Sequence, residues 1–154
     1  MKIEKAKRKL IKGIKELALE VKPKGEFFEL KGGGKSSYYL DMRIIHLHPK
    51  YMDYVVRLLR HELEKLKVNF NKFGGPSIGA DPIIGALCSR KVLMNLESIP
   101  TGYLIRPEPK DHGKSGRIVG DVRAGDACVL IEDVATTGKS SVDAIKVLQE
   151  AEAS

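Results

Sequence analysis

Residues 129–141 place three kinds of chemistry in one short segment. An apolar run ends at the carboxylates Glu132 and Asp133, two threonines and a glycine follow, and a helical pattern begins at residue 141. The N-terminus of a helix offers free backbone N–H groups and the positive end of a dipole, so such a turn can bind a phosphate. The carboxylates would repel phosphate and instead suit the hydroxyls of a sugar. The segment therefore predicts a site for a phosphorylated sugar.

Two other interpretations of this segment are weaker. A polar strand-to-helix turn with a capping threonine or serine contains the same residue types, but it does not require an acidic pair followed by this ordered turn. Residues 137–140 match the last residues of a P-loop motif. However, Glu132 and Asp133 occupy the position of the first glycine of that motif. We therefore do not assign the segment to the P-loop class.

The apolar strand, the Glu-Asp pair and the Thr-Thr-Gly turn resemble the phosphoribosyl pyrophosphate (PRPP) signature of type I phosphoribosyltransferases. Three further segments resemble motifs of orotate phosphoribosyltransferases, in the same order along the chain. They are the hood motif at residues 28–41, the pyrophosphate-side loop at 75–82 and the catalytic lid at 106–113. The resemblance implies transfer of the 5-phosphoribosyl group from PRPP to orotate. The products would be orotidine 5′-phosphate and pyrophosphate, in pyrimidine (UMP) biosynthesis.

The resemblance also implies roles for individual residues. PRPP would be bound by a set from the hood, the lid and the turn: Lys31, Arg106, Lys110, His112, Glu132, Asp133, Val134, Ala135, Thr136, Thr137, Gly138, Lys139 and Ser140. Orotate would be bound by Tyr39, Leu40 and Thr136, and the catalytic residues would be Lys110 and Asp133. Mg²⁺ would be the cofactor, held mainly by the substrate and not by a protein metal site. The family's lid reaches into the neighbouring subunit, which implies a homodimer with shared active sites.

The chain departs from the family pattern in two places. The family lid usually has a lysine directly after its arginine, where this chain has Pro107, and Pro109 stiffens the segment further. Lys114 and Arg117 are candidates for the missing cation. The family also carries a further strand and helix, with an arginine for the orotate carboxylate, whereas this chain stops at Ser154. A phosphoribosyltransferase for another base, a non-catalytic PRPP-binding regulator and a truncated homologue therefore stay open as alternatives.

The elements that must position these residues alternate between strand and helix. Helical patterns cover residues 3–20, 49–66, 83–91 and 141–150, and β-prone runs cover residues 27–30, 38–45, 68–73, 103–106 and 127–131. This alternation predicts an α/β fold with a parallel sheet flanked by helices, and the resemblance makes it the Rossmann-like type I phosphoribosyltransferase fold. The continuous apolar run at 127–131 predicts a strand buried on both faces. We expect one domain over residues 1–154, with an N-terminal helix and hood in 1–45, an α/β core in 46–154 and a mobile lid loop in 107–125.

Composition excludes several classes of protein. The chain has 154 residues, of which 42% are hydrophobic and 31% charged, and this suits a globular domain better than a disordered chain. No apolar run approaches the ~20 residues that span a bilayer, and two cysteines give no disulfide framework. We expect a cytoplasmic protein that does not bind membranes. The net charge of +7 suggests an anionic partner; PRPP fits this charge, and nucleic acid is not expected because no helix-turn-helix segment is visible.

Overall fold

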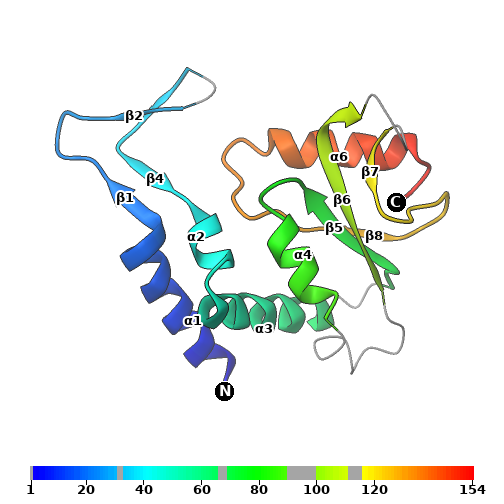
Figure 1. Cartoon of the computed structure of the whole chain (residues 1–154), viewed down its shortest axis with the longest axis horizontal. Coiled ribbons are helices and arrows are strands. Elements are labelled where there is room, and N and C mark those ends of the chain that lie inside the picture. Colours follow the sequence, from blue (N-terminus) through cyan, green and yellow to red (C-terminus); the bar gives the residue numbers. More distant parts are fainter. Residues whose placement is uncertain (1, 31–32, 66–68, 90–99, 111–115) are drawn as a thin grey trace. The chain divides into compact units, whose positions relative to one another are not determined.

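A computed structural model of the chain describes residues 2–30, 33–65, 69–89, 100–110 and 116–154, with Lys110 described by its backbone only (Figure 1). The predictions for Lys31 and His112 therefore lie outside the described residues. The chain divides into two compact units, Met1–Leu58 and Leu59–Ser154, and each is described by itself. No helix within the described ranges is long and apolar enough to cross a membrane.

The first unit combines helices with two small antiparallel ribbons. Its elements in chain order are α1 (Ile3–Gly13), the π-helical turn η1 (Ile14–Ala18), β1 (Leu19–Val21), β2 (Phe28–Glu29), β3 (Lys35–Ser36), β4 (Tyr38–Leu40) and α2 (Met42–His46), and α3 (Pro49–Lys65) continues into the second unit. β1 pairs with β4 and β2 pairs with β3, both outside the main sheet. The predicted β-run at 38–45 is wrong after Leu40, because the Asp41 side chain accepts a hydrogen bond from the Arg43 backbone N–H at 3.1 Å and starts a short helix.

Within the described residues, the second unit is built on a sheet of four strands. Its strands are β5 (Lys72–Pro76), β6 (Thr101–Lys110), β7 (Gly116–Val119) and β8 (Cys128–Leu130), in the order β7-β6-β5-β8. β5 runs parallel to both β6 and β8, whereas β7 is antiparallel to β6. Besides the end of α3, the described helices of this unit are α4 (Asp81–Leu87) and α6 (Lys139–Glu150). The predicted α/β class with a parallel sheet is confirmed.

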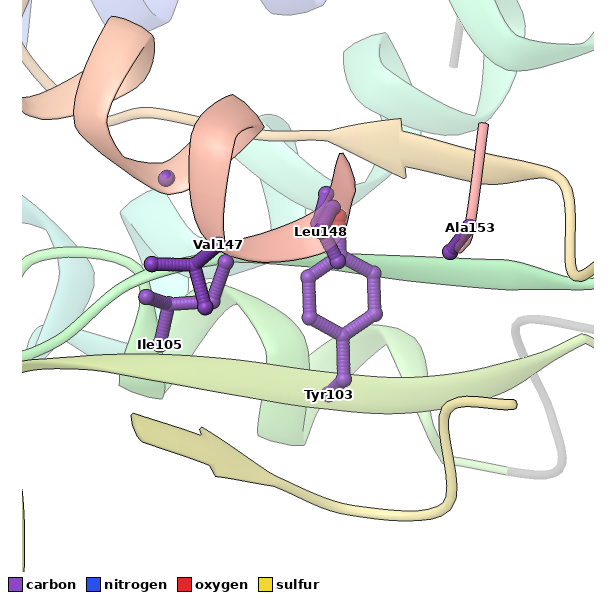
Figure 2. Packing of buried hydrophobic residues seen from close by; sticks show 6 residues of the cluster. Tyr103, Ile105, Val147, Leu148 and Ala153 are labelled. Carbon is purple, nitrogen blue, oxygen red and sulfur yellow. The ribbon is translucent and has the colours of Figure 1, made fainter. Parts of the chain in front are cut away.

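The core lies on both faces of this sheet because successive side chains of β6 point to opposite sides. A Cβ on Gly102 would lie 2.9 Å from Cγ2 of Ile84 and crowd the α4 side. Tyr103 and Ile105 face the other way and pack against α6 (Figure 2), in a buried cluster with Ala144, Val147, Leu148 and Ala153. The Tyr103 hydroxyl donates a hydrogen bond to the carbonyl oxygen of Val129 on β8 at 3.2 Å. Gly74 on the intervening strand has no side chain to obstruct this ring, and a Cβ there would overlap it.

β8 lies at the edge of the sheet and is half-buried along its length, so the prediction of a strand buried on both faces is wrong. The residues after α6 return to this edge. The Ser154 N–H donates to the carbonyl oxygen of Asp126 at 2.9 Å, and the Ser154 carbonyl oxygen accepts from the Cys128 N–H at 2.6 Å. These two hydrogen bonds pair Ser154 with β8 in the parallel manner.

The expected loop over residues 107–125 contains regular structure. Residues 107–110 belong to β6 and residues 116–119 to β7, so the expectation of an irregular loop is wrong there. The pairing register shifts between Ile105 and Lys110. Pro107 and Pro109 lie in this interval and have no backbone N–H to donate. The hydrogen-bond ladder between β6 and β7 is therefore irregular here. Mobility of the segment stays a prediction, and residues 111–115 lie outside the described ranges.

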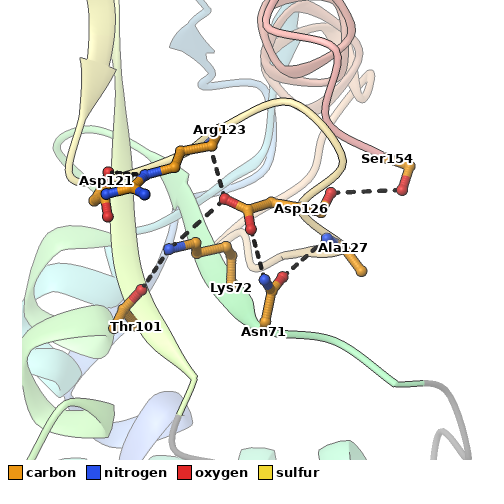
Figure 3. Close-up of polar contacts among 8 residues, drawn as sticks. All are labelled: Asn71, Lys72, Thr101, Asp121, Arg123, Asp126, Ala127 and Ser154. Atoms are coloured by element: carbon orange, nitrogen blue, oxygen red, sulfur yellow. Dashed lines mark hydrogen bonds and ion pairs between the residues drawn. The ribbon is translucent and has the colours of Figure 1, made fainter.

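A polar cluster fixes the amino ends of β5 and β8 (Figure 3). The Lys72 ammonium lies 3.0 Å from Oγ1 of Thr101 and 3.7 Å from the Asp126 carboxylate, and the Asn71 amide donates to the same carboxylate at 2.5 Å. The Arg123 N–H also donates to Asp126, at 2.8 Å. This hydrogen bond, with those from Asn71 and Lys72, holds the pKa of Asp126 below its usual value. The cluster anchors the sheet at the end opposite to its carboxyl edge.

Candidate functional site

Two loops meet at the carboxyl edge of the parallel strands. One follows β5 and leads to α4, and the other follows β8 and leads to α6. Gly79 in the first loop lies against the Asp133 carboxyl group in the second, so closely that a Cβ on Gly79 would overlap it. A Cβ on Gly75, further back in β5, would overlap the carbonyl oxygen of Ile131. These glycines therefore allow the pyrophosphate-side loop and the acidic pair, which are distant in sequence, to share one site.

Glu132 is tied to the start of α6. Its Oε1 accepts a hydrogen bond from the Ser140 hydroxyl at 2.6 Å, and its Oε2 accepts one from the Ser141 hydroxyl. A carboxylate oxygen has two lone pairs, so both oxygens can still accept bonds from a ligand. The carboxylate is therefore oriented by the same helix whose N-terminus faces the turn. Ser141 closes the predicted segment 129–141, but the predicted binding residues end at Ser140, so its contact with Glu132 is a finding of the structure.

The turn itself is exposed. Ala135, Thr136 and Thr137 are open to solvent, and Gly138 adopts the left-handed conformation with φ of 73° before the helix begins. The Lys139 N–H points to the Thr137 hydroxyl oxygen at 3.4 Å. The helix starts at Lys139 and not at residue 141 as predicted, which brings its free N–H groups directly behind the turn. An anion placed there would be stabilised by these groups and by the helix dipole.

Arg106 and Arg117 meet in the β6–β7 hairpin. The Arg106 guanidinium lies 3.5 Å from the Gly116 carbonyl oxygen, and Arg117 Nε donates to the Arg106 carbonyl oxygen at 2.9 Å. The Arg117 guanidinium also pairs with Asp143 on α6. Hydrogen bonding to Asp143 raises the pKa of Arg117, and hydrogen bonding to Arg117 lowers the pKa of Asp143. The structure thus pairs Arg117 with Asp143, and its expected use as the missing cation for PRPP stays a prediction.

The remaining predicted site residues belong to the first unit or lie outside the described residues. Tyr39 and Leu40 belong to β4 of the first unit; the Tyr39 ring lies 5.6 Å from that of Phe28, and Leu40 pairs with Leu19. Because the two units are described separately, their roles toward orotate stay predictions. Lys31, His112 and the Lys110 side chain lie outside the described residues.

Comparison with known proteins gives consistent relatives. No family model matches the chain. The orotate phosphoribosyltransferase of Pyrococcus horikoshii is 37% identical over 123 residues, which are 80% of this chain and 62% of that protein. The orotate phosphoribosyltransferase of Methanothermobacter thermautotrophicus is 34% identical over 149 residues, covering 96% of this chain and 74% of that protein.

A solved phosphoribosyltransferase structure from Corynebacterium diphtheriae is similar to this fold, with a TM-score of 0.75 and 29% sequence identity. That match covers 97% of this chain and 77% of the solved one. The chain spans less than two thirds of the length of the Pyrococcus relative and about three quarters of the other two.

Proposed function

The chain belongs to the orotate phosphoribosyltransferase family, and on that premise we propose that it transfers the 5-phosphoribosyl group from PRPP to orotate, in pyrimidine (UMP) biosynthesis. One observation carries the proposal. The acidic pair, the exposed turn and the N-terminus of α6 lie together at the carboxyl edge of the sheet, beside the loop that contains Gly79. Open α/β sheets bind their ligands at this edge.

The turn and the acidic pair would bind different parts of the phosphoribosyl group. The backbone N–H groups of residues 134–140 would hold the 5′-phosphate, since the helix dipole and the free donors both favour an anion. Glu132 and Asp133 would accept hydrogen bonds from the ribose hydroxyls, and Ser140 and Ser141 orient the first of these carboxylates. Recognition thus needs both the phosphate and the sugar, which supports PRPP over a simple phosphate.

The reaction exchanges one bond at the anomeric carbon of the ribose. The bond to the pyrophosphate oxygen breaks, the bond to the orotate ring nitrogen forms, and pyrophosphate carries away the electron pair. Arg106, Lys110, His112 and Lys31 would stabilise the growing negative charge on the leaving group. Asp133 would stabilise the positive charge that develops on the ribose, and Tyr39, Leu40 and Thr136 would line the orotate pocket.

Mg²⁺ would accompany the pyrophosphate of PRPP, and the chemistry of this site fits it. Mg²⁺ prefers oxygen ligands, usually one or two carboxylates together with substrate phosphates. Within the part of the chain that the structure describes, no group of three or more His, Cys, Asp or Glu side chains could hold a metal ion. Asp133 makes no hydrogen bond or ion pair with another described residue, so its carboxylate is available as a protein ligand to an ion held mainly by PRPP. When bound, the ion would supply charge neutralisation at the leaving group.

The proposal is tested by following the loss of orotate absorbance with PRPP and Mg²⁺. The wild-type chain should turn over orotate, and Lys110→Ala should lose turnover with a much smaller effect on PRPP binding, measured by calorimetry. Lys5→Ala, which removes an exposed lysine of α1, is the matched control and should stay active. A wild-type chain inactive with orotate but active with a purine would point to another base. PRPP binding without turnover of any base would point to a regulator or a truncated homologue.

A cytoplasmic homodimer with shared active sites is part of the proposal. The free thiols of Cys88 and Cys128 suit a reducing compartment. If the lid of one subunit serves the PRPP turn of the other, Lys110→Ala and Asp133→Ala remove residues from different subunits at each site. Mixing and reassembling the two inactive variants should then restore about a quarter of the wild-type activity through mixed dimers. A mixture that stays inactive although mixed dimers form would contradict shared sites.

A further inference from the structure

Two adjacent serines hold the Glu132 carboxylate, one on each oxygen. The Ser140 hydroxyl donates to Oε1 at 2.6 Å, and the Ser141 hydroxyl donates to Oε2. Both serines lie in the first turn of α6, and Glu132 lies two residues after the end of β8. A serine hydroxyl has one proton, so it donates to one acceptor at a time. While either serine holds Glu132, its hydroxyl is therefore not a donor to a ligand.

The two serines differ in their surroundings. Ser140 is exposed, next to the exposed turn, whereas Ser141 is half-buried. Ser141 lies three residues before Ala144 and seven before Leu148, and both of these belong to the buried cluster that packs against β6. This spacing places Ser141 on the side of α6 that faces the sheet. The Ser141 hydroxyl is therefore confined near Glu132, while the Ser140 hydroxyl is free to turn toward a ligand in the turn.

The backbone at Ser140 supplies further donors for a phosphate. The first backbone hydrogen bond of the helix runs from the Val142 N–H to the Gly138 carbonyl oxygen, at 2.9 Å. Among the described residues, no acceptor binds the backbone N–H of Ser140 or Ser141. A phosphate held by the Ser140 N–H would lie within reach of the hydroxyl of the same residue. That hydroxyl then has two competing acceptors, the phosphate and Glu132.

We propose that the two serines have different roles when a sugar phosphate binds. Ser140 releases Oε1 of Glu132 and donates to the 5′-phosphate, and the lone pair freed on Oε1 accepts a ribose hydroxyl. Ser141 keeps its bond to Oε2 and is the positioning residue that holds the carboxylate in place. Binding of the phosphate thereby prepares Glu132 for the ribose. This inference rests on the proposed function and explains how the two halves of the phosphoribosyl group are recognised together.

The experiment compares calorimetric affinities of the full chain for inorganic phosphate and for ribose 5-phosphate. Ser140→Ala removes a phosphate donor but leaves Glu132 held by Ser141, so both probes should weaken by a similar factor of about ten, as for a hydrogen bond to a charged group. Ser141→Ala removes the fixed support of Glu132, so ribose 5-phosphate should weaken about tenfold. Phosphate should weaken less than about threefold in that variant, because the backbone N–H groups still bind it. Ser141→Thr keeps the hydroxyl and should restore affinity for ribose 5-phosphate.

The matched control is Ser89→Ala, which makes the same change at an exposed serine just after the end of α4 and should bind both probes like the wild type. A Ser140→Ala variant that weakens ribose 5-phosphate but not phosphate would overturn the proposal, because its hydroxyl would then stay with Glu132. The proposal would also be overturned if Ser141→Ala weakened both probes equally or neither, or if the wild-type chain bound neither probe. A wild-type chain that binds ribose 5-phosphate but does not turn over orotate would contradict the proposed function alone.

Discussion

The Asp133 carboxyl group lies directly against the backbone of Gly79, and the space between them would not hold even a methyl group. The two residues come from loops that follow different strands, β5 and β8, so this contact joins the acidic pair to the pyrophosphate-side loop. The contact is possible because the residue at position 79 is glycine, which has no side chain. Asp133 is the residue for which we propose the most direct role at the ribose. Its placement depends on Gly79, a residue that is distant in sequence.

Gly79→Ala is expected to reduce activity without unfolding the protein. The added methyl group must displace the Asp133 carboxylate or the loop, and a shift of about 1 Å at a reacting centre can lower the rate about 100-fold. Gly85→Ala is the control, because a Cβ at Gly85 in α4 meets nothing within 4 Å. The control should be slightly more stable, since alanine is favoured over glycine in a helix by about 1 kcal/mol. Equal kcat/KM in the two variants would contradict the role given to this contact.

Glu132→Gln is expected to weaken PRPP binding while leaving pyrophosphate binding nearly unchanged. A hydrogen bond to a charged group is worth about 1.5–3 kcal/mol, so PRPP affinity should fall tenfold or more. Calorimetric titration with each ligand makes the comparison. Glu150→Gln, at the other end of α6, is the control and should bind both ligands like the wild type. If pyrophosphate binding fell as much as PRPP binding, Glu132 would not be a ribose contact.

Tyr103→Phe is expected to lower the free energy of unfolding by about 1 kcal/mol, because the Val129 carbonyl loses its bond from the Tyr103 hydroxyl. Burial also raises the pKa of Tyr103, so the hydroxyl stays a donor at any pH at which the protein is used. Urea unfolding provides the measurement. Tyr38→Phe serves as the control, since Tyr38 is 58% exposed. A Tyr103→Phe variant as stable as this control would show that the bond across β5 contributes nothing.

Asp126→Asn is expected to reduce the loss of stability in acid. The pKa of Asp126 is lowered in the folded state, first by the hydrogen bond from the Arg123 N–H and then by those from Asn71 and Lys72. A lowered folded pKa gives stability that is present above the unfolded value near 3.8 and is lost as the pH falls through the folded value. Unfolding free energies of wild type and variant should therefore differ most at neutral pH and converge in strong acid. A difference that does not change with pH would contradict this assignment.

The sequence allowed much of the fold class and the centre of the site to be predicted. The acidic pair, the turn and the helix start are contiguous, so the chemistry of Glu132, Asp133 and residues 134–140 could be inferred from neighbours along the chain. The periods of strand and helix likewise lie within short windows of residues. A prediction that depended on a strand's position in the sheet was wrong. The apolar run around Val129 predicts a strand buried on both faces, but β8 lies at an edge of the sheet and is half-buried.

Local residue order therefore determined the alternation of elements, the motifs and the kind of ligand that we propose, since backbone propensity and contiguous chemistry are set by near neighbours. Only the tertiary structure decided that Gly79 lies against Asp133, that Arg117 is bound by Asp143 and that residues 107–110 extend a strand. The first two are contacts between residues far apart in sequence: Gly79 meets Asp133 where the paired strands β5 and β8 end, and Arg117 reaches Asp143 where α6 packs on β6 through the cluster around Tyr103 and Leu148. Such packing depends on the shapes of both surfaces together, which no local pattern of one segment contains.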